Sequence, residues 1–361
     1  MEKGKGKISI RQVMFLFVVT VYTPSVRFVA GYSAGKAKQA AWLTPLATLI
    51  PFLVLIYVLN ALLQKYKGLS FMDIIYDVTS RFWGKIILLL YLVWLTVLLA
   101  LYVRYYAERL VTSVYPNVNM NLFTISMLLI VAIIIRAGIV AIARMNEIIF
   151  LIELFVILSL FLLMIPTIKT DYLTPISSMD IVPVMKGSIG NTGLIYITYL
   201  FFFSDRFSRT KEFIRYSLYA GIFLWLVSTI IIITSVGTLG HSIVGRSPLS
   251  FLIAVKNISL LGVLSGFESI LVASWILTDF ILIIVFTYSI MNITKSLLNL
   301  RDFKPFINIF LVILYLLTWI LGVNVFELQA FSADFAIQMN LLMQIIVPIL
   351  IFFIAKIRKK V

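Results

Sequence analysis

The sequence predicts an all-α polytopic membrane protein with about ten transmembrane helices, arranged as a five-plus-five inverted repeat in which helices one and six are broken. Composition is the first reason: 62% of the 361 residues are hydrophobic and the mean hydropathy is +1.08, whereas soluble domains contain roughly 45–50% apolar residues. Apolar stretches also recur at the length that a helix needs to cross about 30 Å of hydrocarbon. Finally, the first and sixth stretches are interrupted by proline or glycine, as in transporters built from inverted repeats.

Ten apolar stretches fit membrane spans, within a single transmembrane domain over residues 1–361. An even number of spans places both termini on one side of the membrane. The first stretch is longer than the apolar region of a cleavable signal peptide, so we expect it to stay in the mature protein. Five spans belong to a first repeat, 9–168, and five to a second, 187–356. The spans are 9–30, 42–63, 86–107, 122–142, 148–168, 187–203, 217–238, 268–291, 306–325 and 338–356.

Two of the connections between spans carry a pattern of their own. The connection 64–85 contains the amphipathic run F-M-D-I-I-Y-D-V, which predicts a helix lying in the membrane interface. The connection 239–267 mixes glycines and a proline with apolar runs, which predicts a short surface helix over the outer mouth.

Charge and rare residues exclude several classes of function. The net charge is +15, but most of the 30 Lys and Arg residues fall in short segments on the side of the termini. This distribution indicates cytoplasmic termini and not nucleic-acid binding. With no cysteine and a single histidine, His241, we expect neither disulfides nor a metal site. No hydrolase, Walker or kinase motif occurs, so we expect no enzyme activity and no cofactor.

The first span is interrupted by Pro24. Proline lacks an N–H, clashes with the carbonyl four residues back and biases Thr23 away from helical geometry. Backbone groups freed at membrane depth must find partners in neighbouring helices, in the hydroxyls of Thr20, Thr23 or Ser25, in water or in a ligand. The pattern fits either an ordinary kinked helix or a discontinuous helix that forms a binding site.

The sixth span opens with glycines at every third position, Gly187, Gly190 and Gly193. Taken alone, these glycines fit close packing of helices. Because the span corresponds in position to the one that contains Pro24, we favour a second discontinuous helix and a central binding site between the two.

Charged residues inside spans are costly and are candidates for function. Arg136 and Glu153 lie at nearly equal depth on the two sides of a tight hairpin, which predicts an ion pair, structural or gating. Arg27 and Arg104 lie near span ends, where they can reach the interface, and Arg104 has helical spacing to Glu108.

Asp279 lies near the middle of the eighth span, with no basic residue expected at that depth. It is either a ligand or proton site or a quiet protonated residue. Ser274 and Thr278 share its helix at a spacing of four and can contribute to the same cavity.

Most of the aromatic residues fit packing or interface roles, but four tyrosines fall at mid-depth and can line a cavity. The candidate ligand-binding residues are therefore Tyr22, Thr23, Pro24, Ser25, Tyr91, Tyr196, Thr198, Tyr199, Ser274, Thr278 and Asp279.

Residues from Ala137 onward carry a resemblance to a known family. The run A-G-I-V-A-I-A-R-M-N-E-I resembles the G-[IL]-E-x-[IL]-A-R-x-x-E-I signature of the B subunits of GerA-type spore germinant receptors. L-T-P-I at 173–176 and G-Y-S-A-G-K-A-K-Q-A-A-W-L after span one are similar to further family elements. Two features differ: Val140 replaces an acidic residue, and the aspartate expected shortly before Trp42 is missing.

The resemblance implies a fold and a function. The family is similar to amino acid permeases of the amino acid, polyamine and organocation (APC) superfamily, with a LeuT-like repeat whose broken helices one and six bind an amino acid through exposed backbone groups. It implies a spore inner membrane, a receptor A subunit and a lipoprotein C subunit as partners, and an amino acid germinant as ligand. A nutrient sensor is the leading hypothesis. The alternatives are a proton- or ion-coupled amino acid permease, with Asp279 carrying the coupling charge, and a scaffold that binds no ligand.

Overall fold

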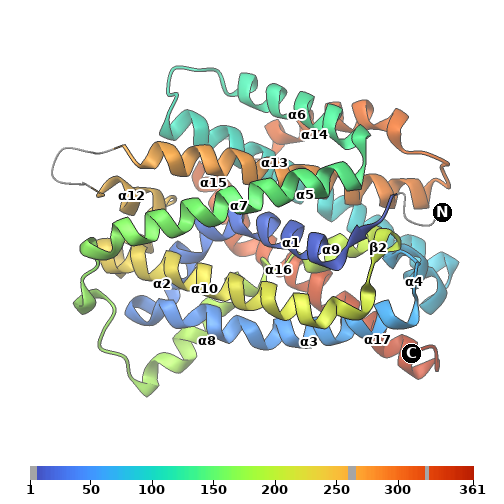
Figure 1. Ribbon diagram of the computed structural model, residues 1–361, viewed down its shortest axis with the longest axis horizontal. Coiled ribbons are helices and arrows are strands. Elements are labelled where there is room, and N and C mark those ends of the chain that lie inside the picture. Colours follow the sequence, from blue (N-terminus) through green and yellow to red (C-terminus); the bar gives the residue numbers. More distant parts are fainter. Residues whose placement is uncertain (1–5, 259–265, 322–324) are drawn as a thin grey trace.

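Long helices lie side by side in the computed structural model, which describes residues 6–258, 266–321 and 325–361 (Figure 1). The first described residues and the C-terminus lie at the same end of this bundle, here called the termini end. The other end carries the short helices α11 (His241–Val244) and α12 (Ser250–Lys256).

The first half of the chain supplies five spans. Span one runs through α1, the π-helical segment η1 and α2, and the chain then turns back at η2 (Lys38–Leu43). The helices are α1 (Ile10–Pro24), η1 (Ser25–Val29), α2 (Ala30–Ala37), α3 (Thr44–Lys65), α4 (Phe71–Val78), α5 (Arg81–Ser113), α6 (Met120–Ala137) and α7 (Ile139–Met164).

The second half supplies the other five spans. Span six is split into α8, α9 and a 3-10 turn, and the last span contains two π-helical segments. The elements are α8 (Ile181–Thr192), α9 (Ile197–Leu200), η6 (Phe201–Arg206), α10 (Phe213–Leu239), α13 (Glu268–Leu297), α14 (Ile307–Ile320), α15 (Val325–Ala330), η9 (Phe331–Ala336), α16 (Ile337–Leu341), η10 (Leu342–Ile346) and α17 (Val347–Ile357).

The predicted number of spans agrees with this architecture. Within the described ranges, seven helical stretches are long and apolar enough to cross a bilayer. The first of them, Ile10–Lys65, contains two spans because the chain reverses within it. The shorter apolar helix Lys304–Ile320 and the split span six complete the ten. The protein is therefore a multi-pass membrane protein.

The predicted boundaries were inaccurate at the start of the last span, predicted at 338 but observed by Glu327, and around the hairpin of spans four and five. We predicted a connection of several residues there, but α6 and α7 are separated only by Gly138, whose φ of +85° is a conformation that glycine adopts without strain. Helix α7 therefore begins nine residues before the predicted start at 148. Helix α5 also continues beyond its predicted end, to Ser113.

The centre of the bundle is formed by α13, of which 72% of the most apolar window is buried. Helices α1 and α5 pack directly against it, and α1 also packs against α7 and α10. Helix α8 lies on α2 and α3. The two interrupted spans, one through α1 and the other through α9 and η6, both contact α13, which is the most buried of the seven long apolar stretches.

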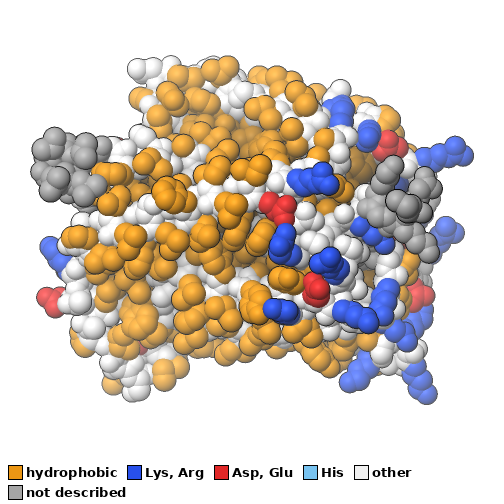
Figure 2. Space-filling model, in the orientation of Figure 1, with side chains coloured by type: hydrophobic (Ala, Val, Ile, Leu, Met, Phe, Trp, Pro, Cys, Tyr) orange, Lys and Arg blue, Asp and Glu red, His pale blue; other side chains and the backbone are white. Residues whose placement is uncertain are grey.

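Hydrophobic side chains cover the middle of the face shown in Figure 2, whereas Lys and Arg gather at the termini end. Large apolar residues such as Ile133 and Phe155 are 69% and 73% exposed. Exposure of this kind is expected of a surface that faces lipid tails, where apolar side chains need no covering.

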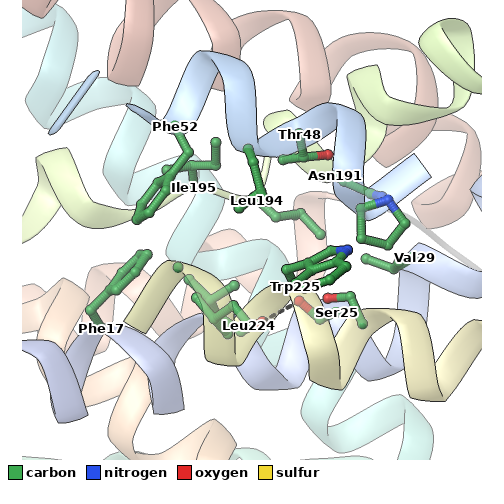
Figure 3. A pocket seen from close by; sticks show the side chains of 15 residues that line it. Phe17, Ser25, Val29, Thr48, Phe52, Asn191, Leu194, Ile195, Leu224 and Trp225 are labelled. Carbon is green, nitrogen blue, oxygen red and sulfur yellow. Dashed lines mark hydrogen bonds between the residues drawn. The ribbon is translucent and has the colours of Figure 1, made fainter. Parts of the chain in front are cut away.

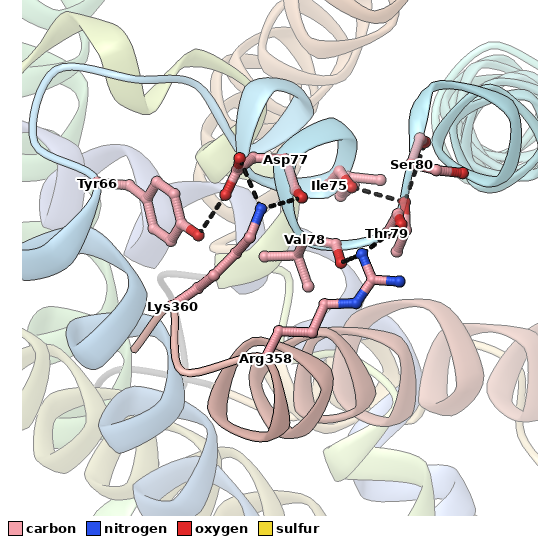
Figure 4. Close-up of polar contacts among 8 residues, drawn as sticks. All are labelled: Tyr66, Ile75, Asp77, Val78, Thr79, Ser80, Arg358 and Lys360. Carbon is pink, nitrogen blue, oxygen red and sulfur yellow. Dashed lines mark hydrogen bonds and ion pairs between the residues drawn. The ribbon is translucent and has the colours of Figure 1, made fainter.

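The predicted interfacial helix is α4, and the C-terminus holds it (Figure 4). Ser70 and Asp73 form a capping box at its start. Arg358 donates to the carbonyl oxygens of Val78 and Thr79 at 2.8 and 2.7 Å, which satisfies carbonyls left free at the end of the helix. Lys360 binds Asp77 at 2.8 Å.

A short parallel strand pairing joins the start of span one to the end of span six. Strand β1 (Ile8–Ser9), directly before α1, pairs with β2 (Phe207–Ser208), directly after the split span six. Ser208 adds a hydrogen bond from its hydroxyl to the Ile8 carbonyl at 3.0 Å. Spans one and six are therefore tied together at the termini end.

Candidate functional site

The split of span six lies just after its glycines. Helix α8 ends at Thr192, and α9 begins at Ile197. A β-carbon on Gly187 would lie 2.7 Å from Cγ2 of Thr44, and one on Gly190 would lie 2.7 Å from Cε1 of Tyr32. The glycines therefore serve the close packing that we had considered, and the chain also leaves helical geometry directly beyond them.

Carbonyl oxygens freed at the split are bound by a side chain from the last span. The Gln344 amide donates to the Gly193 carbonyl at 2.6 Å and to the Thr192 carbonyl at 3.4 Å. In return, Thr198 donates through its hydroxyl to the Gln344 carbonyl at 2.6 Å. Tyr91 donates to the neighbouring Met343 carbonyl. A π-helical turn such as η10 leaves backbone carbonyls without their usual α-helical partners, so side chains here replace helix hydrogen bonds on both spans.

Span one is interrupted less severely. The chain continues past Pro24 as the π-helical segment η1, so the interruption changes the hydrogen-bond pattern without opening a loop. The Ser25 hydroxyl donates to the Val21 carbonyl at 2.7 Å, as we had expected for one of the nearby hydroxyls. Thr23 and Thr278 join α1 to α13 by a hydroxyl pair at 2.7 Å.

Two predicted tyrosines, Tyr196 and Tyr199, lie in a cluster of polar and aromatic side chains next to the split. Asn340 accepts hydrogen bonds through its amide oxygen from Trp94 and Tyr199, both at 3.0 Å. Its amide nitrogen donates to the Tyr196 hydroxyl at 3.3 Å, and that hydroxyl also bonds to Tyr102. Tyr91 lies apart from this group and packs against Phe202.

Most of the predicted ligand residues lie on or next to α1, α9 and α13, which contact one another, and η10 contacts α9. All eleven are buried, and the three that lie at the split, Tyr196, Thr198 and Tyr199, are each 0% exposed. The conformation is therefore closed, and a ligand needs an opening movement to reach them.

Asp279 has a basic partner, contrary to our expectation. Arg109 on α5 pairs with it directly and also lies over the Trp275 ring, at 4.5 Å from the centroid. We had placed Arg109 in a connection outside the membrane, but α5 continues to Ser113 and carries it to the level of Asp279. Both side chains are buried, so Asp279 belongs to a buried ion pair.

The predicted ion pair of Arg136 and Glu153 does not form. Arg136 donates to the Ala132 carbonyl and, at 2.7 Å, to Asn308. The early start of α7 explains the error: Arg136 lies at the very end of α6, whereas Glu153 lies about 20 Å along α7. The expected pair of Arg104 and Glu108 is present, at 3.5 Å. Arg104 is nevertheless buried and does not reach the interface as predicted.

A small cavity of about 50 Å³ lies beside both interruptions (Figure 3). Ser25, Asn191 and Trp225 line one end of it, and the rings of Phe17 and Phe52 line the other. Asn191 is anchored by a hydrogen bond from its amide to Thr44 at 3.1 Å. At the end of the bundle opposite the termini, a larger cavity of about 360 Å³ is lined by Arg27, Tyr105, Arg109 and Lys256 among others.

Sequence reasoning missed Gln344, Asn340, Asn191 and Arg109. A signal was present for two of them, because Asn340 and Gln344 are polar residues four apart within an apolar span, a spacing that places both on one face of a helix. Arg109 could be assigned only with the true end of α5.

Solved structures with a similar fold are transporters. The manganese transporter of Eremococcus coleocola, in complex with an aromatic bis-isothiourea substituted compound, aligns with a TM-score of 0.66 and 16% identity, over 94% of this chain and 78% of that chain. Mhp1, a nucleobase-cation-symport-1 family transporter in a closed conformation with bromovinylhydantoin bound, aligns with a TM-score of 0.57 and 11% identity, over 99% and 96%. At these identities the likeness shows the fold alone, and it confirms the predicted fold class.

The sequence comparisons are more specific. No curated protein sequence matches the chain at a significant level. The sequence profile described as spore germination protein matches residues 7–327, which is most of the chain and includes both interrupted spans. The chain, a membrane protein with a transporter fold, therefore belongs to the spore germination protein family.

Proposed function

We propose that this protein is a nutrient-sensing subunit of a spore germination receptor, which binds a small germinant, an L-amino acid, between its two interrupted spans. The observation that carries the proposal is the set of side-chain hydrogen bonds that replaces helix hydrogen bonds at the split. The Gly193 carbonyl accepts from the Gln344 amide at 2.6 Å, and the Thr192 carbonyl accepts two long bonds, from that amide at 3.4 Å and from the Ile195 N–H at 3.3 Å. Such a bond can be exchanged for a bond to a ligand without breaking a helix.

An amino acid has the chemistry for this exchange. Its ammonium group can take the place of the Gln344 amide on the two carbonyls, and hydrogen bonds from a charged donor are roughly twice as strong as those from a neutral one. N–H groups at the interruptions are the expected partners of the ligand carboxylate. The cluster of Tyr196, Tyr199 and Asn340 would then contact the side chain of the ligand.

Signalling requires that the ligand favour one arrangement of the helices. Because the candidate residues are buried, the closed conformation must open for entry and close again around the ligand. A preference of about 100-fold for one arrangement corresponds to about 2.7 kcal/mol. The A subunit and the lipoprotein C subunit of the receptor would sense that shift.

The proposed location is the spore inner membrane, with both termini in the cytoplasm. The gathering of Lys and Arg at the termini end supports this orientation, since basic residues are concentrated in the short cytoplasmic segments of membrane proteins.

A coupled amino acid permease is the second candidate. It is favoured by the fold that this chain shares with a manganese transporter and a nucleobase-cation symporter. In the permease hypothesis, Asp279 carries the coupling charge, but its pairing with Arg109 makes that role less suitable. Net uptake of the ligand would distinguish this function from sensing.

The test is binding of a panel of radiolabelled amino acids to the purified protein, followed by uptake into sealed proteoliposomes with a proton gradient. The sensor hypothesis predicts saturable binding without accumulation, weakened about tenfold or more by Thr23→Val or Tyr196→Ala. Gradient-driven accumulation would indicate a permease. Absence of binding to the isolated subunit would contradict this proposal and favour the scaffold.

Gln344→Ala adds a sharper readout. The variant removes the side-chain donor of the Gly193 carbonyl, so the ligand-free protein should unfold at a lower temperature and gain more stability from ligand than the wild type. Gln338→Ala is the matched control, since Gln338 lies on the same span and is exposed. Equal stabilisation of all three proteins by the ligand would show that Gln344 does not occupy the ligand's place.

A further inference from the structure

Glu153 lies in the interior of the bundle. It is 4% exposed, on the face of α7 that packs against α1 and α13. Neither carboxylate oxygen makes a hydrogen bond of ordinary length and angle with any described residue. The other carboxylates discussed above differ, since Asp279 pairs with Arg109 and Glu108 with Arg104.

Two further polar groups meet Glu153 at this point. The Tyr22 hydroxyl on α1 is buried and likewise lacks a hydrogen-bond partner among the described residues. Ser274 on α13 lies next to both groups, although its hydroxyl donates to the Leu271 carbonyl at 3.1 Å. Glu153, Tyr22 and Ser274, here called the Glu153 cluster, therefore join three different helices.

The free-energy cost of burying a charged carboxylate determines whether Glu153 is ionised or neutral in this conformation. Moving an ionised carboxylate out of water costs several kcal/mol even after relaxation, and here no cation repays that cost. A neutral carboxylic acid avoids the penalty. After a small side-chain rotation, it can also donate a hydrogen bond to the hydroxyl of Ser274 or of Tyr22.

The other ionisable groups on elements packed against α7 do not supply a counter-charge. Tyr22 is the titratable group that faces Glu153 from α1, and Ser274 is the polar group that faces it from α13. Several of the remaining groups have partners of their own: Arg11 pairs with Glu147, Arg136 bonds to Asn308, and Arg215 bonds to Tyr219. The remaining groups on these elements are Tyr216, Glu268, Asp279, Tyr288 and Lys295. Of these, Lys295 is the cation, and it lies about 30 Å along α13 from Ser274, too far to pair with Glu153.

A metal cation fits the cluster less well than a proton. The cluster offers four oxygens, two from Glu153 and one each from Tyr22 and Ser274, whereas a hard cation such as Ca²⁺ takes six to eight. In the described ranges, no three His, Cys, Asp or Glu side chains come together at a metal-binding distance.

We propose that Glu153 is a proton-binding site whose occupancy is coupled to the movement of span one. Tyr22 directly precedes Thr23, which is bonded to Thr278, and it lies at the end of α1 just before η1. When span one moves away from α7, water reaches Glu153 and the acid releases its proton to it. When the span returns, a proton from water binds the carboxylate again. No electron is transferred.

The coupling rests on the proposed function, because it uses the opening movement that admits a ligand. Linkage then requires that ligand affinity depend on pH wherever the opened and closed states bind different numbers of protons. For a single coupled proton the affinity changes by at most about tenfold per pH unit.

The first measurement is infrared spectroscopy of the purified, ligand-free full chain at neutral pH. A protonated carboxylic acid has a carbonyl-stretching band separate from the bands of carboxylates. We expect such a band in the wild type, shifted by ¹³C-glutamate but not by ¹³C-aspartate labelling, and absent from Glu153→Gln. Glu147→Gln, on the same helix, is the matched control because Glu147 is paired with Arg11. It should keep the band.

Tyr22→Phe gives a second test that leaves the carboxyl in place. Loss of the hydroxyl should shift the same band by changing its hydrogen bonding. A neutral-pH spectrum without a glutamic acid band, or with a band that persists in Glu153→Gln, would overturn the proposal. The isotope result needs no variant, so misfolding of Glu153→Gln cannot hide the answer.

Amino acid binding measured at several pH values then tests the coupling. The wild type should show an affinity that depends on pH, and Glu153→Gln should not. An unchanged pH dependence in Glu153→Gln would refute the coupling. If no amino acid binds at any pH while the glutamic acid band is present, the proposed function fails and the proton site stands.

Discussion

Single residues near the centre of this bundle differ in how their charge is compensated. Asp279 and Arg109 compensate each other, whereas Glu153 forms no ion pair with any residue that the structure describes. Both carboxylates lie in apolar spans and look alike in sequence. Their surroundings in the folded protein give them opposite properties, one suited to holding two helices together and the other to exchanging a proton.

Removing one partner of the Arg109 and Asp279 pair should be more harmful than removing both. Asp279→Asn leaves a buried guanidinium without its counter-charge, which costs about 3–5 kcal/mol, whereas the double variant Asp279→Asn with Arg109→Gln leaves no charge behind. Thermal unfolding in detergent should therefore show the lowest midpoint for the single variant. Additive effects of the two substitutions would contradict the pairing.

At the scale of elements, the two interrupted spans are held in different ways. Span one keeps a continuous course through a π-helical segment, and span six is split and packed closely by its glycines. Helix α8 approaches α2 and α3 because Gly187 and Gly190 have no side chains. The split after Gly193 is therefore positioned by helix packing.

Gly190→Ala should separate α8 from α2. The new β-carbon would lie 2.7 Å from Cε1 and 2.9 Å from Cγ of Tyr32, and because Cγ lies on the axis of ring rotation, turning the ring about the Cβ–Cγ bond does not relieve the contact. We expect a loss of stability of about 1–3 kcal/mol and weaker germinant binding.

Gly35→Ala is the control for this prediction, since its β-carbon would meet only the Gly245 carbonyl, at 3.8 Å. It should be neutral or slightly stabilising, because alanine favours a helix more than glycine does. Equal unfolding temperatures for the two variants would show that the approach of α8 is not tight.

The contact between α4 and the C-terminus should weaken in acid. Hydrogen bonds from Lys360 and then Tyr66 hold the pKa of Asp77 below its ordinary value. A lowered pKa stabilises the folded state at pH values above the unfolded pKa, about 3.9. That stabilisation is lost as the pH falls through the lower folded value.

Hydrogen exchange of α4, compared between neutral pH and the region below pH 4, measures this effect. After correction for the intrinsic exchange rates, protection of α4 should fall in acid for the wild type and stay nearly constant for Asp77→Asn. If Asp77→Asn loses protection in acid to the same extent as the wild type, another group is responsible.

At the scale of the whole molecule, the two ends of the bundle differ in charge. The termini end carries most of the basic side chains seen in Figure 2, and the opposite end carries the cavity lined by Arg27, Arg109 and Lys256. We therefore expect the termini end in the cytoplasm and this cavity on the other side of the membrane.

The absence of cysteine makes this orientation easy to test. Lys359→Cys at the termini end should react with a membrane-impermeant thiol reagent only after the membrane is opened. Lys256→Cys, at the opposite end, should react in intact cells or right-side-out vesicles. The reverse pattern would place the termini outside.

The sequence by itself determined the class of the protein, the ten spans and the positions of both interruptions. These features follow from local chemistry: apolar length fixes a span, Pro24 removes a backbone donor, and glycines permit close packing. The resemblance around Ala137 to Glu147 also led to the family that the sequence profile confirms.

Only the tertiary structure decided which polar groups are partners. The depth of a side chain depends on where its helix begins and ends. The predicted end of α5 was six residues too early and the predicted start of α7 nine residues too late, and these errors led to the wrong partners for Asp279, Arg136 and Glu153. Gln344 binds carbonyls about 150 residues away in sequence, at the split of span six. Such contacts are set by how whole helices pack, and pattern and propensity along the chain carry no information about that packing.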